Sequence, residues 1–246
     1  MMQPYRDGAR AYASECIAGV HVRWGHEHVT VDLPRRAPIW SSAVFHGGSW
    51  TGTRILNCMV RKGFDCSEPV RYMQEMCGQW GYAPDDTVGL MTAAKVTHAS
   101  VSEEHGDGCS LLCVTTAGTS NAARAGLARQ VFSAYEPLKP GTINTIIVLD
   151  GRLSDAAVWN VFMTATEAKC AALADLHIYD KETERMATGT TTDAIAFAML
   201  DSGRYNKVHP YAGTATTIGN AVGRLVYETV TESVATQHEA DGSLFP

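Results

Sequence analysis

The sequence predicts a mixed α/β (α+β) sandwich in a single domain, with a β-rich N-terminal half and a strand–helix–strand–helix C-terminal half. Three observations indicate this fold class. Apolar and polar residues alternate with period two through much of the first half. In the second half, strand-like segments alternate with segments of helical period. The 246 residues contain no internal repeat or low-complexity linker, and 45% are hydrophobic, enough for one large core.

The first third of the chain predicts strands. Residues 20–24 and 29–33 alternate on either side of a glycine, which is typical of a β-hairpin. We interpret residues 1–38 as an N-terminal hairpin extension of the domain. Residues 39–45 predict another strand, which ends at a pair of glycines.

A helix and a second hairpin are expected next. Ser67 is the predicted cap of the helix, Pro69 lies in its first turn, and apolar residues then recur at helical spacing. Residues 87–97 and 110–116 are strand-like, and the segment 103–108 between them is rich in turn residues. The two strands are therefore expected to form a hairpin.

The second half predicts a regular alternation of elements. A strand over 142–149 is followed by a helix that Ser154 caps and that runs to about residue 173. A strand over 187–200 follows, and the last element is an amphipathic helix over 217–234. This order does not require a parallel sheet.

Composition excludes several functional classes. The net charge of −6 and the absence of a Lys/Arg cluster argue against nucleic acid as a partner. No apolar run is long enough for a membrane helix, and the first ten residues lack the apolar core of a signal peptide. Seven irregularly spaced cysteines favour reduced thiols, so we expect a cytoplasmic protein. The oligomeric state stays open, with a homo-oligomer as one alternative.

Six strand ends or helix starts carry dense sets of small polar residues and glycine. Any one of them alone is typical of a helix cap or tight turn. Glycine allows close approach of a ligand to the backbone, and Ser, Thr and Asn supply short hydrogen-bonding groups, so six such segments at one end of a sheet would build a polar pocket. The segments are 41–48, 115–126, 141–144, 166–169, 187–193 and 211–214.

Four of these segments also carry a family resemblance. They are T-A-G-T-S-N-A-A-R-A-G at 116–126, G-T-I-N at 141–144, T-E-A-K at 166–169 and A-T-G-T-T-T-D-A at 187–194. In this order the motifs resemble the adenosylcobinamide amidohydrolases of the CbiZ type. The resemblance covers about residues 39–230, and an eleven-residue run with ordered companions is a specific signal.

The resemblance implies an enzyme that hydrolyses the amide between the aminopropanol arm and the corrin side chain of adenosylcobinamide. The implied products are adenosylcobyric acid and aminopropanol, formed in the salvage of cobalamin precursors. The implied ligand is a small-molecule corrinoid. No cofactor is expected, because the cobalt corrinoid is itself the substrate.

Amide hydrolysis requires stabilisation of an oxyanion, activation of a nucleophile and a proton for the leaving amine. Asn121, with the backbone amides of 118–120, is the candidate for an oxyanion hole. Glu167 or Asp193 is the candidate base, with Lys169 as charge partner or acid. Glu167 and Lys169 lie two apart on a predicted helix and do not share a face, so at most one of them points at the pocket.

The remaining polar residues of the segments are candidates for substrate binding, and the choice of nucleophile among the hydroxyls stays open because none has a histidine beside it in sequence. Tyr211 is a candidate for apolar contact with the ring, or else a core residue. The candidate substrate-binding residues are Ser41, Ser42, Gly47, Gly48, Thr116, Gly118, Ser120, Arg124, Asn144, Thr188, Thr190 and Tyr211.

Metal chemistry is not expected. His26 and His28, and the four histidines and cysteines within 98–113, have loose spacing and no C-x-x-C, which favours ordinary strand and turn residues. Neither H-E-x-x-H nor G-x-S-x-G occurs. Two alternative functions remain: an amide hydrolase for a smaller substrate, and a corrinoid-binding protein without turnover.

Overall fold

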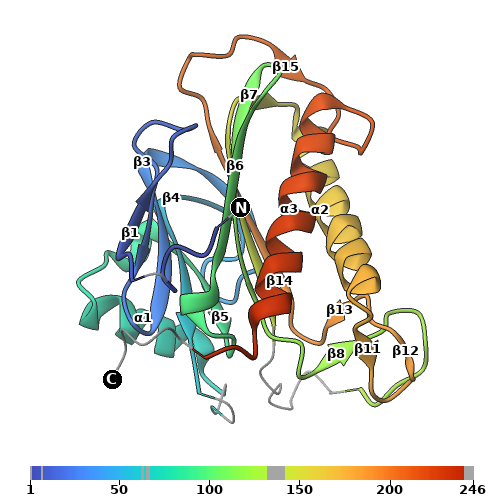
Figure 1. Cartoon of the computed structure of the whole chain (residues 1–246). Coiled ribbons are helices and arrows are strands. Elements are labelled where there is room, and N and C mark those ends of the chain that lie inside the picture. Colours follow the sequence, from blue (N-terminus) through green and yellow to red (C-terminus); the bar gives the residue numbers. More distant parts are fainter. Residues whose placement is uncertain (1, 7, 62–63, 65–66, 132–141, 241–246) are drawn as a thin grey trace.

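The computed structural model describes residues 2–6, 8–61, 64, 67–131 and 142–240. Within these ranges the fold is a mixed α/β structure built on a nine-stranded sheet (Figure 1). The strands of this sheet are β1 (Ala11–Ala13), β2 (His21–Trp24), β3 (His28–Ser41), β4 (Gly48–Met59), β5 (Thr87–Thr92), β6 (Ser100–Gly106), β7 (Cys109–Ala117), β9 (Ile143–Asp150) and β14 (Ala194–Leu200).

Three α-helices, several two-residue strands and two short 3-10 helices, at Pro84–Asp86 and Val96–His98, complete the described elements. The helices are α1 (Pro69–Gln79), α2 (Asp155–Asp175) and α3 (Thr217–Thr236). The short strands are β8 (Ala122–Ala123), β10 (Arg152–Leu153), β11 (Tyr179–Asp180), β12 (Arg185–Met186), β13 (Gly189–Thr190) and β15 (Val208–His209). They pair as β8 with β13, β10 with β15 and β11 with β12.

The sheet mixes parallel and antiparallel neighbours. Its main path is β1-β2-β3-β14-β9-β7-β6, and β4 pairs with both β3 and β5. The β14–β9 and β4–β5 pairs are parallel, and the other pairs in the sheet are antiparallel. The parallel β9–α2–β14 connection is the strand–helix–strand unit that the C-terminal half predicts.

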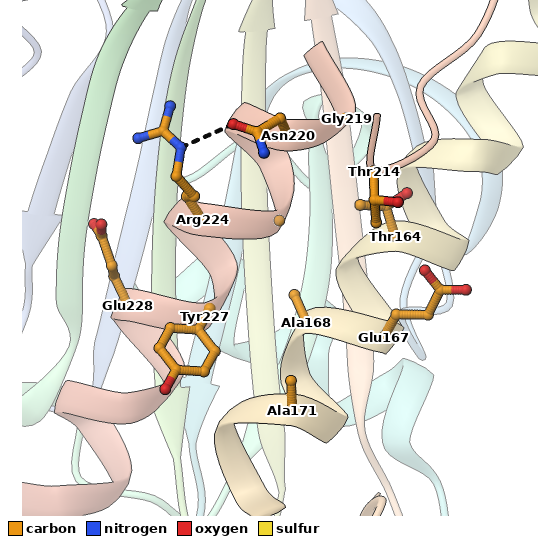
Figure 2. Close-up of a pocket in the computed structure, with 11 residues that line it drawn as sticks. Thr164, Glu167, Ala168, Ala171, Thr214, Gly219, Asn220, Arg224, Tyr227 and Glu228 are labelled. Atoms are coloured by element: carbon orange, nitrogen blue, oxygen red, sulfur yellow. Dashed lines mark hydrogen bonds between the residues drawn. The ribbon is translucent and has the colours of Figure 1, made fainter. Parts of the chain in front are cut away.

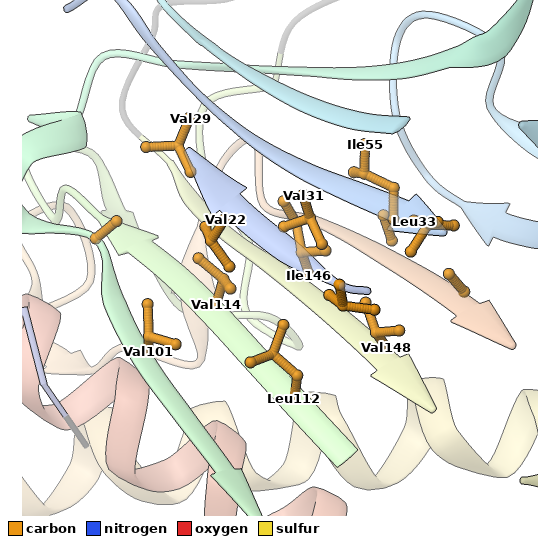
Figure 3. Close-up of a cluster of buried hydrophobic side chains, with 14 of the residues drawn as sticks. Val22, Val29, Val31, Leu33, Ile55, Val101, Leu112, Val114, Ile146 and Val148 are labelled. Carbon is orange, nitrogen blue, oxygen red and sulfur yellow. The ribbon is translucent and has the colours of Figure 1, made fainter. Parts of the chain in front are cut away.

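Strand β9 separates two apolar cores, because successive side chains of a strand point to opposite faces. Ile147 and Leu149 face α2 and α3, which lie side by side on one face of the sheet (Figure 1). Ile146 and Val148 face the other core (Figure 3). That core also contains Ile55 of β4 and residues of β6 and β7, so the sheet curls until non-neighbouring strands share one interior.

The fold class is as predicted, but the N-terminal strands differ from the expectation. β3 runs without interruption from His28 to Ser41 and therefore crosses the predicted boundary at residue 38. A register shift between Asp32 and Ala37 accommodates Pro34, whereas Pro38 is in register with Thr51 of β4. Of the predicted strand 39–45, only residues 39–41 are extended, as the end of β3, and residues 42–45 lie outside it. The second glycine of the pair, Gly48, begins β4, an unpredicted strand whose N-terminal half is polar and glycine-containing.

The predicted hairpin between 87–97 and 110–116 is wrong. β5 ends at Thr92 and pairs in parallel with β4, and a short 3-10 turn at Val96–His98 follows it. The hairpin partner of β7 is instead β6, which the turn residues of 103–108 partly form. Strand propensity identified both segments as extended but carried no information on which of them would pair with β7.

The helices agree closely with the sequence, apart from the start of α1. The Ser154 hydroxyl caps α2 by accepting a hydrogen bond from the Ala157 amide at 3.2 Å. The N-cap of α1 is Glu68 rather than Ser67, and no side chain caps it. The predicted strand over 187–200 consists of β13 and β14, separated by a turn. No α-helix in the described parts of the chain is long and apolar enough to cross a membrane.

His28 ties the start of β3 to the chain that follows α1. Its side chain is buried, its Nε2 lies 2.8 Å from the Tyr82 hydroxyl, and its ring packs 3.9 Å from that of Trp80. A side chain at Gly25 would overlap the imidazole, so glycine is required there. Burial, reinforced by the positive charge of Arg54, lowers the pKa of His28 from 6.5 to about 4.

This depressed pKa predicts a loss of stability in acid. The unfolded chain binds a proton at residue 28 between pH 6.5 and 4 and the native state does not, so the contribution of His28 is complete above pH 6.5 and falls toward pH 4. The difference between these pKa values corresponds to about 3 kcal/mol. Urea unfolding from pH 7.5 to pH 4.5 should show a shallower pH dependence in His28→Gln than in wild type. The exposed-site variant His105→Gln should retain the wild-type slope, and equal slopes in all three proteins would contradict the assignment.

Candidate active site

Five of the six polar segments meet at one end of the main sheet. There the end of β3 lies beside the start of β14, the start of β14 beside that of β9, and the start of β9 beside the end of β7. Lys169 of α2 and the β8–β13 pair lie at the same end (Figure 1). Tyr211 does not join them, because it follows β15, which pairs beyond the far end of β9. Its side chain is 67% exposed.

An ion pair between Lys169 and Asp193 is at the centre of this end of the sheet. Lys169 Nζ donates to Asp193 Oδ2 at 2.5 Å, and the two side chains are only 11% and 13% exposed. Lys169 comes from α2, and Asp193 comes from the turn that leads into β14. Two opposite charges are therefore paired in a mostly buried position.

The Asp193 carboxylate also accepts three other hydrogen bonds. They come from the Ile143 amide at 3.0 Å, the Thr190 amide at 3.0 Å and the Thr190 hydroxyl at 2.5 Å. Four donors thus occupy the lone pairs that this carboxylate offers. The geometry therefore favours Asp193 as the group that positions Lys169 over its predicted role as a base.

Gly189 is required by the close approach of this ion pair. A Cβ atom at position 189 would overlap the Asp193 carboxylate and would lie 2.8 Å from Lys169 Nζ. The glycine of the A-T-G-T motif therefore leaves room for a charged pair directly under the β13 backbone.

An open cavity of about 750 Å³ lies against Lys169 and Asp193. Among the predicted residues, Arg124, Thr188 and Thr190 line it as well. The described residues that line it are Ala123, Arg124, Ala125, Arg129, Gln130, Val131, Thr166, Lys169, Cys170, Thr188, Gly189, Thr190, Thr191 and Asp193.

Cys170 and Arg129 are lining residues that sequence reasoning did not select. Cys170 follows Lys169 on α2, and its thiol donates to the Thr188 carbonyl at 3.0 Å. Burial raises the pKa of this thiol, so it is held as a neutral thiol rather than a nucleophilic thiolate. Arg129 lies only three residues beyond the T-A-G-T-S-N-A-A-R-A-G run, and nothing in its local pattern distinguishes it from a surface arginine.

Asn121 lies beside the cavity, since its Nδ2 donates to the hydroxyl of the lining residue Thr191 at 2.6 Å. The backbone amides expected to form an oxyanion hole with it are largely occupied. The Gly118 amide donates to the Thr142 carbonyl, and the Thr119 amide donates to the Gln237 side chain, both at 2.9 Å. These two amides serve the fold and are not available to an oxyanion.

Glu167 lies outside this cluster. It is exposed and lines a groove of about 370 Å³ between α2 and α3, with Asn220, Arg224 and Tyr227 across from it (Figure 2). Lys169 lines the 750 Å³ cavity instead. The two residues thus point to different sides of α2, as a spacing of two on a helix requires.

Thr116 and Asn144 belong to a buried network on the opposite face of the sheet. Asn144 Nδ2 donates to Asn57 Oδ1 at 2.8 Å and to the Met91 carbonyl at 2.9 Å, and Asn57 Nδ2 donates to the Thr116 hydroxyl at 2.8 Å. Asn57 was not predicted, because its strand β4 was missed. The network bonds β4 to β7 and β9, which are not its neighbours in the sheet.

The other predicted binding residues have local structural contacts. The Ser41 hydroxyl accepts from the Ala43 amide at 3.0 Å, and the Ser42 hydroxyl accepts from the Ile195 amide at 3.1 Å. Gly47 packs against the backbone of this turn, and Gly48 has a φ of 84°. Gly118 and Ser120 line a separate cavity of about 140 Å³.

Within the described residues, no three His, Cys, Asp or Glu side chains are grouped to hold a metal ion. The histidines and cysteines that the sequence singled out have separate partners. His105 Nδ1 lies 2.9 Å from the Ser110 hydroxyl, and Cys113 Sγ lies 3.4 Å from the Thr229 hydroxyl.

Comparison with known proteins defines the family. The sequence model of the adenosylcobinamide amidohydrolases (CbiZ) matches residues 13–242, beyond both ends of the 39–230 resemblance. The chain is 29% identical over 209 residues to the adenosylcobinamide amidohydrolase of Halobacterium salinarum, covering 82% of both chains. It is 32% identical over 187 residues to that of Methanosarcina mazei, covering 74% of this chain and 82% of the relative. The chain therefore belongs to this family of amide hydrolases.

Among solved structures, the chain is similar to an L-aminopeptidase D-Ala-esterase/amidase from Ochrobactrum anthropi, described as a variant of the Ntn hydrolase fold. The sequence identity is 9%, the TM-score is 0.41, and the match covers 92% of this chain and 82% of that one. A TM-score of this size is too low to assign the fold by similarity.

Gly189→Ala should displace Lys169 and Asp193 and lower amide hydrolysis by at least about tenfold, because an oriented charge contributes several kcal/mol at such a site. Steady-state turnover and the thermal unfolding midpoint should be measured together. Gly213→Ala is the matched control, since a Cβ there meets no atom within 4 Å. Full turnover in Gly189→Ala would show that the Lys169–Asp193 ion pair is not part of the active site.

Asn57→Leu should destabilise the protein by about 3 kcal/mol, because it leaves buried polar groups of Asn144 and Thr116 without one of their partners. Equilibrium urea unfolding measures this loss. Asn220→Ala changes an exposed asparagine on α3 and should stay within about 0.5 kcal/mol of wild type. A similar effect of both substitutions would mean that the network does not stabilise the curled sheet.

Proposed function

We propose that this chain hydrolyses the amide bond between the aminopropanol arm and the corrin side chain of adenosylcobinamide. The products would be adenosylcobyric acid and aminopropanol, and the reaction would serve the salvage of cobalamin precursors in the cytoplasm. The observation that carries this proposal is the Lys169–Asp193 pair on the wall of an open cavity, in a chain of this family.

The reaction consumes one water: the amide C–N bond breaks, a C–O bond forms, and the leaving amine takes up a proton. Negative charge develops on the carbonyl oxygen in the tetrahedral intermediate. In our proposal Lys169 stabilises that charge, because its bond to Asp193 uses only one of three ammonium hydrogens. Asp193 fixes the direction of the ammonium through its own bonds to the starts of β9 and β13.

The size of the cavity supports entry of the arm rather than of the whole substrate. A volume of about 750 Å³ suits a drug-sized group, and a corrin macrocycle with its upper ligand is larger. We infer that the amide and the arm enter the cavity and that the ring stays at its open mouth. In this proposal the cobalt belongs to the substrate, and hydrolysis requires no resident metal or cofactor.

Purified protein incubated with adenosylcobinamide should release aminopropanol and form adenosylcobyric acid, as followed by liquid chromatography and mass spectrometry. Turnover should persist in the presence of EDTA. Lys169→Met should lower kcat by at least about a hundredfold, the size of effect that removal of one oxyanion-stabilising group produces.

Lys207→Met is the matched control, because Lys207 is an exposed lysine outside the cavity and its loss should leave turnover unchanged. Binding of adenosylcobinamide without products would indicate a corrinoid-binding protein. Turnover of small amides with no activity on the corrinoid would indicate a different hydrolase.

A further inference from the structure

The segment that follows β8 forms one wall of the cavity. β8 pairs with β13, so Ala122 lies beside Thr190, and residues 123–125 and 129–131 line the cavity together with Lys169. In addition to this two-residue pairing, the Ala125 amide donates to the Thr188 hydroxyl at 3.0 Å. From residue 126 to residue 131, where the described part of this segment ends, the chain forms no helix or strand, and side-chain contacts hold it in place.

A single buried carboxylate supplies the main contacts. Asp180 of β11 is 1% exposed and accepts from the Arg124 amide and from Arg129 Nη1, each at 3.0 Å. It also accepts from the Glu182 amide at 2.9 Å and from the Thr183 hydroxyl at 3.0 Å. The carboxylate thus bonds both its own turn and the cavity wall.

Asp180 is held in its ionised form. Burial by itself raises its pKa, but bonds from the Glu182 and Arg124 amides and the Thr183 hydroxyl, with the charge of Arg129, outweigh burial and lower the pKa below its usual value. A buried ionised carboxylate is costly unless it is fully paired, so this arrangement requires Arg129 in place.

Two carboxylates anchor the guanidinium of Arg129, and the side chain lines the cavity. Its Nη1 contacts Asp180, and its Nη2 lies 3.4 Å from Glu182 Oε2. Each of these nitrogens carries a second hydrogen, and the side chain, 22% exposed, lines the cavity with Lys169. Arg124 also lines the cavity, but its guanidinium is held by a backbone carbonyl, that of Met186, rather than by carboxylates.

We infer that Arg129 is a substrate-binding residue of this cavity and that Asp180 is the residue that positions it. The ligand group would be a carbonyl oxygen of an amide side chain on the substrate, because a guanidinium donates but does not accept hydrogen bonds. The inference rests on the proposed function for the identity of the substrate, but the anchoring of the cavity wall by Asp180 is independent of it.

The kinetic test compares Arg129→Met, Arg129→Lys and Asp180→Asn with wild type on adenosylcobinamide. Arg129→Met should raise KM about tenfold with kcat within about twofold, the size expected for one charge-assisted hydrogen bond to substrate. Asp180→Asn should raise KM similarly. Arg129→Lys should be intermediate, since an ammonium lacks the fork that contacts two partners. Arg152→Met, which breaks an ion pair with Asp201 at the far end of the sheet, should leave KM unchanged.

A second measurement does not require substrate. Hydrogen exchange of the amides in residues 122–130 should accelerate at least about tenfold in Asp180→Asn and stay at the wild-type rate in Arg152→Met. Unchanged exchange in Asp180→Asn overturns the inference, as does an unchanged KM in Arg129→Met. If wild type binds the corrinoid without turnover, the proposed function fails, and the ratio of corrinoid Kd values between Arg129→Met and wild type then decides the inference.

Discussion

The arrangement of the active end depends on one carboxylate, that of Asp193. It accepts hydrogen bonds from the start of β9, from β13 and from Lys169 of α2. Thr190 is a near neighbour of Asp193 in the sequence, but Lys169 and Ile143 lie 24 and 50 residues away, and the parallel pairing of β9 and β14 brings Ile143 beside Asp193. Because four donors surround Asp193, moving any one element changes the position of the ammonium. The geometry of the site therefore depends on the parallel pairing of β9 and β14 at their N-terminal ends.

Two of the three cationic residues that line the cavity are paired with carboxylates. Lys169 is paired with Asp193, and Arg129 is paired with Asp180 and Glu182. Buried charges are tolerated when they are paired and hydrogen-bonded, but such pairs rarely improve stability over apolar packing. Their presence on the wall of a cavity is more readily explained by function.

The sequence predicted the fold class, α2, α3 and strand β9, because each has a strong period and recognisable ends, such as the Ser154 cap. It also predicted that Glu167 and Lys169 would diverge. It did not predict β4, whose first half lacks alternation, nor the β6–β7 pairing. The missing strand concealed Asn57, so the network that joins Thr116 and Asn144 across the curled sheet was not foreseen. Arg129 and Asp180 lie about fifty residues apart, and no local pattern links them.

By itself, the sequence determined the family and the residue types available for chemistry, because motifs and periodicity are local properties of the chain. Only the tertiary structure decided which of those residues meet. It grouped Lys169, Asp193 and Thr190 at one cavity and directed Glu167 to the groove between α2 and α3. It also placed Tyr211 at the far end of the sheet. The physical reason is that strand pairing and the curl of the sheet depend on contacts between residues far apart in the sequence. Packing of the whole core determines them, and no single segment does.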